Sequence, residues 1–136
     1  MVELGRRTGT TSWEPEEEEG VERVDRILAL LFGEELFFAN AGIFRREMHD
    51  QLAKVPETQH VIVDAVAIAD IDYTGMIALS QVVADLAEDK ITFSFSRANE
   101  KVKDRLEKST NVAIKTIALF DSTDAAAVAA EAATRS

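Results

Sequence analysis

The sequence predicts an α/β fold with a substantially parallel sheet. Two observations support this: short apolar segments of strand length recur along the chain, and amphipathic segments with helical spacing separate them. Strands that alternate with helices are typically joined by crossovers, which makes the strands parallel. With 136 residues, of which 46% are apolar, the chain is long enough for one domain whose core needs neither metal nor disulfide.

The composition excludes several classes of function. There are no cysteines, so neither a disulfide framework nor a zinc–thiolate site can form. The net charge of -10 argues against a nucleic-acid partner, because phosphate backbones bind basic surfaces. No apolar run approaches the roughly 18–20 residues of a membrane span, and the N-terminus lacks the apolar region of a signal peptide. We therefore expect the chain as given to be soluble.

Residues 1–23 are predicted to form an acidic linker, with the folded domain over residues 24–136. Residues 1–20 contain two arginines and six glutamates, and four of these, Glu16 to Glu19, follow Pro15 in a row. Adjacent like charges repel and hydrate well, so this segment is not expected to join the core. Trp13 is unusual in such a segment; it either packs back on the domain or contacts a missing neighbour.

The segment that follows residue 24 is interpreted as a strand pair and a helix. Residues 26–32 and 35–41 are short apolar runs separated by Gly33 and Glu34. Asn40 is suited to cap the helix, because its side-chain oxygen can accept a backbone N–H. Along that helix an apolar side chain recurs every four residues. These residues are Phe44, Met48 and Leu52. The aromatic residues Phe37 and Phe38 are expected to lie in the core together with Phe44.

The next strand and helix are the most strongly patterned. Residues 60–68 are mostly apolar at both parities, as in a strand buried on both faces. Helical spacing then runs from residue 72 to residue 88, where the apolar positions are Met76, Leu79, Val83 and Leu86.

Two strands and two helices complete the chain. Residues 90–97 alternate as a period-two strand, and Asn99 is expected to cap a short helix after it. Residues 113–120 are predicted to be the last strand. Ser122 or Thr123 then caps an alanine-rich helix, with Asp124 favourable in its first turn. The predicted order is β-β-α-β-α-β-α-β-α.

Asp70 and Asp72 form the one close carboxylate pair at the end of a predicted strand, where sites in such folds usually lie. Three roles are compatible with this turn: acid–base catalysis, a phosphorylation switch, or helix capping. Capping by Asp72 is the commonest role for such a residue, and Asp70 is then a loop residue that faces water. No partner base or nucleophile completes a catalytic set, so no catalytic residue is predicted.

Metal and nucleotide sites have weaker support. His49 and His60 share metal-ligand spacing with no other ligand, so both are interpreted as surface histidines. The chain has neither a GxGxxG motif nor a P-loop. Glu34 and Glu35 lie in the predicted hairpin, unlike the acidic pair of a phosphoacceptor receiver domain.

The segment 97–108 has five basic and three acidic residues, and its basic positions are candidates for a phosphate. Arg97, Lys101 and Lys103 are weak candidates for binding a phosphate, such as that of a guanine or adenine nucleotide. Such charges more commonly form a solvated helix face.

Three segments together resemble a STAS domain over about residues 24–134: "ELFFANAGIFRREM", "HVIVDAVAIADIDYTGMIALSQVVADL" and "ITFSFSRANEKVKDRLEKS". "LFFANA" is similar to the segment that enters the first helix in STAS domains of SulP-type anion transporters, the sulfate-permease family. The leading "LGRRTGTTSW" resembles the connector between the last membrane helix and the STAS domain in that family.

The resemblance implies a mixed, mainly parallel sheet with about four helices packed largely on one face. It also implies a non-enzymatic regulatory or coupling module of an anion (sulfate) transporter, on the cytoplasmic side of the inner membrane. The expected partners are the transmembrane domain of the same transporter, a second copy of the domain, or a cytosolic regulatory protein. No nucleic acid and no obligatory cofactor is expected.

The other branch of STAS proteins comprises anti-sigma factor antagonists, in which a serine after the aspartate of a D-S-x-G turn is phosphorylated. This chain has Tyr73 at that position, and Thr74 is the next hydroxyl, before Gly75. A phosphate on Thr74 would gain from the helix N-terminus but be repelled by Asp70 and Asp72. The alternative function is therefore a stand-alone antagonist switched by phosphorylation. A hydrolase that uses Asp70 and Asp72 is the third hypothesis.

Overall fold

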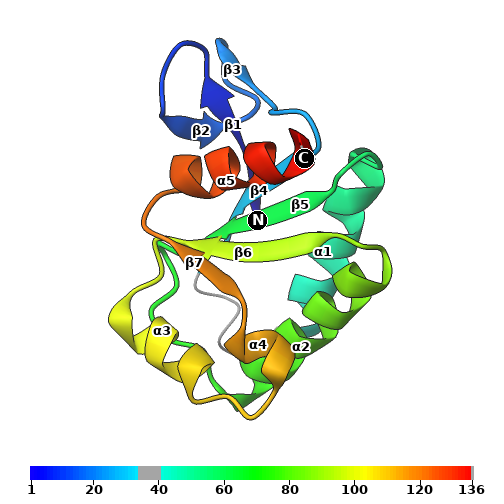
Figure 1. The fold of residues 1–136 in the computed structure, drawn as a ribbon, viewed down its shortest axis with the longest axis vertical. Helices are drawn as coiled ribbons and strands as arrows, with labels where there is room; N and C mark the ends of the chain where they lie inside the picture. Colours follow the sequence, from blue (N-terminus) through cyan, green and yellow to red (C-terminus); the bar gives the residue numbers. More distant parts are fainter. Residues whose placement is uncertain (34–40, 136) are drawn as a thin grey trace.

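The computed structural model describes residues 1–33 and 41–135, which form one mixed sheet with helices on both faces (Figure 1). The strands run in the order β2-β1-β4-β5-β6-β7, and β3 pairs with β1. Their bounds are β1 Val2–Arg7, β2 Trp13–Pro15, β3 Val21–Glu22, β4 Ile27–Leu31, β5 His60–Asp64, β6 Thr92–Ser96 and β7 Ala118–Phe120. The helices are α1 Ala41–Lys54, α2 Tyr73–Glu88, α3 Glu100–Glu107, α4 Val112–Lys115 and α5 Thr123–Arg135.

Strands β4 to β7 form the parallel half of the sheet. Leu30 on β4 is in register with Val63 on β5, which is in register with Phe95 on β6. A crossover through α1 joins β4 to β5, and a crossover through α2 joins β5 to β6, as the alternating pattern predicted. The carboxyl ends of these strands therefore meet at one edge, where loops in such folds build sites.

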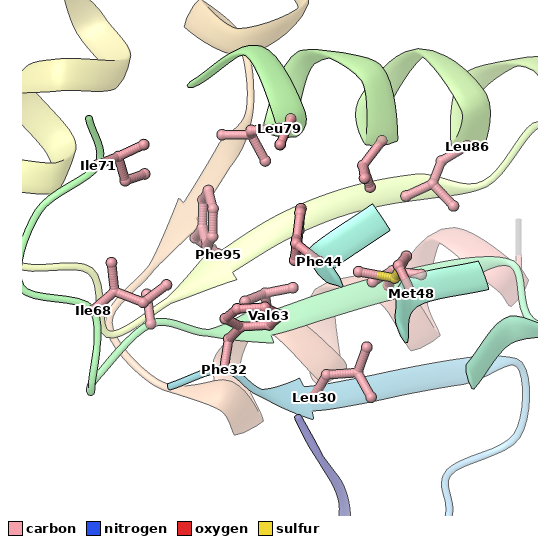
Figure 2. Close-up of a cluster of buried hydrophobic side chains, with 14 of the residues drawn as sticks. Leu30, Phe32, Phe44, Met48, Val63, Ile68, Ile71, Leu79, Leu86 and Phe95 are labelled. Atoms are coloured by element: carbon pink, nitrogen blue, oxygen red, sulfur yellow. The ribbon is translucent and has the colours of Figure 1, made fainter. Parts of the chain in front are cut away.

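The larger core lies between the sheet and helices α1 to α4 (Figure 2). Leu30, Val63 and Phe95 point toward these helices and are almost fully buried, at 0% exposure each. Phe44 on α1 packs edge-on against Phe32, with 4.7 Å between the ring centroids. Four helices thus share one face, in agreement with the expected packing.

The opposite face is covered by α5. Because side chains alternate along a strand, the residues between those of the larger core point the other way. They form a second, smaller cluster with the N-terminal strand and two alanines of α5: Leu4, Ile27, Ala29, Ile62, Ala126 and Ala127.

The expectation that residues 1–20 lie outside the core is wrong. Strand β1 pairs antiparallel with β4, and Leu4 is only 5% exposed. A Cβ on Gly5 would lie 2.6 Å from the Glu22 carbonyl oxygen, so glycine is required where β3 crosses β1 so closely. The acidic run from Glu16 to Glu19 forms the turn between β2 and β3, where its charges are hydrated.

Among the described residues, the antiparallel partner of β4 is β1. The predicted pairing partner of this strand was the segment 35–41. Most of that segment lies outside the described residues, and with it the predicted cap Asn40 and the aromatic residues Phe37 and Phe38. Helix α1, with Phe44 and Met48 buried, confirms the helix predicted after residue 40.

The last predicted strand, residues 113–120, divides into two elements. Asn111 accepts hydrogen bonds from the backbone N–H groups of Ala113 (2.9 Å) and Ile114 (3.4 Å), and so begins the short helix α4. Only the final part of the predicted strand is β7. Ser122 caps α5 as predicted, because its hydroxyl accepts the Ala125 N–H at 3.0 Å.

Candidate functional site

The turn from Asp70 to Gly75 joins β5 to α2 at the carboxyl edge of the parallel strands. Ile68 and Ile71, both 1% exposed, point into the larger core and hold this loop on the domain (Figure 2). The intervening Asp70 and the following Asp72 are therefore directed outward.

Asp72 is the N-cap of α2, as predicted. Its carboxylate accepts the backbone N–H of Gly75 at 2.7 Å, and its carbonyl accepts the N–H of Met76 at 2.9 Å. A carboxylate in this position satisfies an otherwise unpaired helix N–H and interacts favourably with the positive end of the helix. The role of Asp72 that the structure displays is thus capping.

Asp70 does not simply face water, in contrast to the prediction. Its carboxylate accepts two hydrogen bonds from Arg105 on α3, at 3.0 and 3.2 Å, and lies 3.4 Å from the Lys101 ammonium. The hydrogen bonds from Arg105 are the main cause that lowers the pKa of Asp70 to about 2, assisted by the Ile71 N–H. The group is a permanent anion at neutral pH that ties this turn to α3.

Asn99 makes a second tie between the loop and α3. Its side-chain N–H groups donate to the carbonyls of Ile68 and Ala69, both at 3.1 Å. Its side-chain oxygen accepts the Val102 N–H at 2.8 Å and so caps α3, as predicted. One amide therefore orders both the helix and the loop that precedes the candidate turn.

Asp64 and Arg97 link the ends of β5 and β6. The Asp64 side chain is 2% exposed and accepts a bidentate pair of bonds from Arg97, with Nε at 3.0 Å from Oδ1. Arg97 adopts a φ of 57°, a left-handed conformation unusual for a non-glycine residue. Because a buried carboxylate needs a partner, this ion pair explains why the strained backbone is retained.

Each of the three basic phosphate candidates faces a carboxylate. Arg97 binds Asp64, Lys101 binds Asp70, and the Lys103 ammonium lies 3.7 Å from Glu100. A phosphate would have to compete with these carboxylates for the same donors. Nucleotide binding at Arg97, Lys101 and Lys103 stays a prediction, and the geometry around them favours internal ion pairs.

Tyr73 and Thr74 are the exposed residues of the candidate turn. The Tyr73 side chain reaches into solvent, with 81% of the residue exposed, and Thr74 beside it is exposed too. Gly75 is buried. The turn thus presents a phenol and a hydroxyl at the start of α2, and its role as a surface for a protein partner stays a prediction.

Sequence reasoning missed Asp64, Asn99 as a loop anchor, and Arg105 as the partner of Asp70. Asp64 has a recognisable signal, since an ionisable residue at the end of a fully apolar strand needs a counter-charge. The identity of that partner was not readable, because Arg97 lies 33 residues away in the chain.

The remaining ambiguous residues also have defined places. Trp13 packs back on the domain: its Nε1–H donates to Asp124 at 2.9 Å, and the Arg6 guanidinium lies 5.3 Å from the centre of its ring. His49 is exposed, as predicted. The interpretation of His60 as a surface residue is wrong, since it is 9% exposed and lies between Thr92 and Thr134.

No helix among residues 1–33 and 41–135 has the length and hydropathy needed to cross a membrane.

Several solved structures share this fold at low sequence identity. Two are chains of the anion transporter SLC26A9: one, "The overall structure of SLC26A9", superposes with a TM-score of 0.80 over 97% of this chain at 16% identity. The murine protein in its inward-facing state gives a TM-score of 0.82 over 96% of this chain at 17% identity. This chain spans only 24% and 22% of those two transporters.

Two smaller proteins match as well. A putative anti-sigma factor antagonist from Thermotoga maritima has a TM-score of 0.67 at 19% identity, over 79% of this chain and 90% of its own. The SulP transporter STAS domain from Vibrio cholerae has a TM-score of 0.64 at 22% identity, over 86% of this chain and 90% of its own.

No curated protein matches the chain in sequence. The profile of the STAS domain, in contrast, matches residues 20–126, which is most of the chain. Together with the mixed, mostly parallel sheet, this match establishes that the chain belongs to the STAS domain family.

Proposed function

We propose that this chain is the regulatory and coupling STAS domain of a SulP-type anion transporter, acting without catalysis on the cytoplasmic side of the membrane. Its partners would be the transmembrane part of the same transporter, another STAS copy, or a cytosolic protein. Sulfate or a related inorganic anion is the substrate class that we infer for the transporter.

The observation that carries this proposal is the N-terminal hairpin region, β1 to β3, which is an integral part of the sheet. The superposition with the two SLC26A9 transporters extends over 96–97% of the chain, which takes in this region. The superposition with the anti-sigma factor antagonist covers 79%, and that with the isolated SulP STAS domain covers 86%. A chain that enters the domain through β1 would transmit a displacement at its N-terminus directly to β4, the strand with which β1 pairs.

We propose that the domain is non-catalytic because Asp70 and Asp72 both make structural interactions. Asp72 is engaged as a helix cap and Asp70 is neutralised by Arg105 and Lys101. A general acid or base requires a pKa near the working pH, whereas the pKa of Asp70 is lowered to about 2. These features support a structural use of both carboxylates.

The proposal is tested first by the coding sequence upstream of residue 1. About ten or more apolar spans in the same reading frame are expected there, and a reading frame that starts at Met1 would overturn the transporter assignment. The second test uses the full-length protein in membrane vesicles. Deletion of the domain should reduce uptake of labelled sulfate while the amount of transporter in the membrane, measured by immunoblot, stays comparable.

A phosphorylation-switched antagonist remains the second candidate, because Thr74 is exposed in the first turn of α2, next to the position phosphorylated in that branch. The test is incubation of the purified chain with a partner Ser/Thr kinase of the same organism, followed by mass spectrometry. Phosphate on Thr74, lost in Thr74→Val, would favour the switch over the transporter module. Unmodified Thr74 under conditions that phosphorylate a D-S-x-G control protein would exclude it.

A further inference from the structure

Helices α1 and α2 lie side by side on the larger core (Figure 1). Residues of both helices line a groove of about 380 Å³. Both helices return from the carboxyl edge of the parallel sheet, so they run in the same direction. The floor of the groove is apolar and is formed by Met48 and Leu52 from α1 and by Val82 and Leu86 from α2.

The two walls of the groove carry opposite charge. The wall from α1 contributes Arg45, Arg46 and His49, whereas the wall from α2 contributes Asp85 and its C-cap Asp89. No acidic residue of α1 and no basic residue of α2 lines the groove. In a chain with a net charge of -10, a basic wall on this one helix is a local departure from the overall charge.

The charges at one end of the groove already pair with each other. Arg45 donates to Asp85 across it, with distances of 3.0 and 3.3 Å. Both side chains are about half exposed, at 50% and 51%, and such an ion pair contributes at most about 1 kcal/mol, so it can exchange for other partners.

One helical turn further along, the corresponding residues are His49 and Asp89. The side chains of these two and of Arg46 make no hydrogen bond or ion pair within residues 1–33 and 41–135. The groove therefore combines a buried apolar floor with charged groups on both walls that have capacity for a ligand.

We propose that this α1–α2 groove binds an amphipathic helix of a protein partner. The partner helix would insert apolar side chains between the two helices, carry acidic residues on the flank that faces α1, and carry basic residues on the flank that faces α2. An amphipathic helix has an apolar stripe between two polar flanks, which matches the floor and the two walls. The opposite charges of the walls fix the direction in which it lies, because the reversed arrangement places like charges together.

A second copy of the chain is the less favourable occupant. Two copies with a net charge of -10 each repel at low ionic strength, and two concave grooves do not fill one another. The docking proposal does not depend on the transporter assignment, since the groove lies on helices of the domain itself.

The test uses two helical peptides of identical composition. In the first, a Leu stripe is flanked by Glu on the side that would face α1 and by Lys on the other. In the second, Glu and Lys alternate on both flanks, so that neither direction of the peptide matches both walls. The first peptide is expected to shift the backbone amide signals of residues around Arg46, His49 and Asp89. It should bind about tenfold more tightly than the second, as expected for a few surface charge pairs.

Charge reversal of the groove provides the decisive variant. Arg46→Glu combined with His49→Glu and Asp89→Lys should reverse the direction in which the first peptide lies. A spin label at the N-terminus of that peptide should then broaden amide signals at the opposite end of the groove. Lys115→Glu is the control, because it changes the charge outside the groove and should leave the direction as it was.

Gly42 allows an independent block. It lines the groove, and a Cβ at this position would meet no described atom within 4 Å, so Gly42→Phe is chosen to place a ring at the groove. This variant should abolish peptide binding and keep the far-ultraviolet circular dichroism of the parent. Equal affinity for the two peptides, amide shifts confined to another surface, or no binding at millimolar peptide would each overturn the proposal. A dimer in size-exclusion chromatography that Gly42→Phe dissociates would also overturn it, in favour of a second copy.

Discussion

The two faces of the sheet are held by different kinds of interaction. On the face of α1 to α4, large apolar side chains such as Leu79 and Phe95 are fully buried. On the face of α5, the core is smaller, three of its six buried residues are alanines, and the helix is attached by polar contacts at both ends. Apolar burial is non-directional and insensitive to pH, whereas ion pairs and buried imidazoles respond to pH and salt.

The polar contacts of α5 connect it to the N-terminal hairpin. Arg6 on β1 donates to Asp124 at 2.9 Å and to Glu131 at 2.8 Å, while Trp13 on β2 donates to the same Asp124 oxygen. At the other end of the helix, Thr134 bonds His60. The face of α5 is therefore where the first and last segments of the domain depend on each other, and where changes of solution conditions act first.

The largest effect is expected from a truncation on the apolar face. Leu79→Ala removes a side chain that is 0% exposed and should lower the free energy of unfolding by about 2–5 kcal/mol, because a cavity is left in the core. Urea denaturation followed by circular dichroism measures the change. Ile77→Ala on the same helix is the control, since Ile77 is 42% exposed, and its effect should be within about 0.5 kcal/mol. Similar losses for the two variants would contradict the assignment of this core.

A smaller effect is expected at the junction of α5 with the hairpin. Asp124→Ala deprives Trp13 and Arg6 of a common acceptor and should cost about 1–2 kcal/mol, as for other part-buried hydrogen bonds to a charged group. Trp13 is the only tryptophan, so its fluorescence reports this junction directly. A shift of its emission maximum to longer wavelength is expected. An unchanged emission maximum would show that the indole does not depend on Asp124.

The face of α5 should also lose stability in mild acid. Burial lowers the pKa of His60 from its usual 6.5, so the neutral imidazole is favoured in the folded state. Below about pH 6.5 the unfolded chain therefore binds the proton more readily, and stability falls as the pH drops through the lowered folded pKa. Thermal unfolding between pH 7.5 and 5 should show this slope, and His60→Gln should flatten it. The same slope in the variant would place its origin elsewhere.

The smallest effect concerns Asp70, whose ion pairs are accessible to water. Its pKa of about 2 lies below the usual 3.8, so its contribution to stability is present above about pH 4 and disappears as the pH falls toward 2. Arg105→Gln removes the main cause and should raise the pKa of Asp70 toward its usual value. The side-chain carboxyl carbon signal, followed by NMR over this pH range, measures it. A pKa unchanged in Arg105→Gln would leave Lys101 and the Ile71 N–H as the dominant causes.

Patterns confined to neighbouring residues were readable before the fold was known. Asp72 and Asn99 cap their helices as predicted, because an N-cap bonds to an N–H only three residues away. Strand β5 is indicated by residues 60–68, which are mostly apolar at both parities, and the alternation of strands and helices indicates the parallel half of the sheet. These signals are local, so composition and spacing carry them.

The sequence by itself determined the α/β class, the helix caps, the apolar core face and the resemblance to STAS domains. Tertiary structure decided what β1 pairs with, which base neutralises Asp70, and that His60 is buried. The partners in these cases lie far along the chain: Arg105 is 35 residues from Asp70 and Thr134 is 74 residues from His60. Pairing at such separations depends on how the sheet orders its strands. A local residue pattern does not indicate which distant elements will meet after folding.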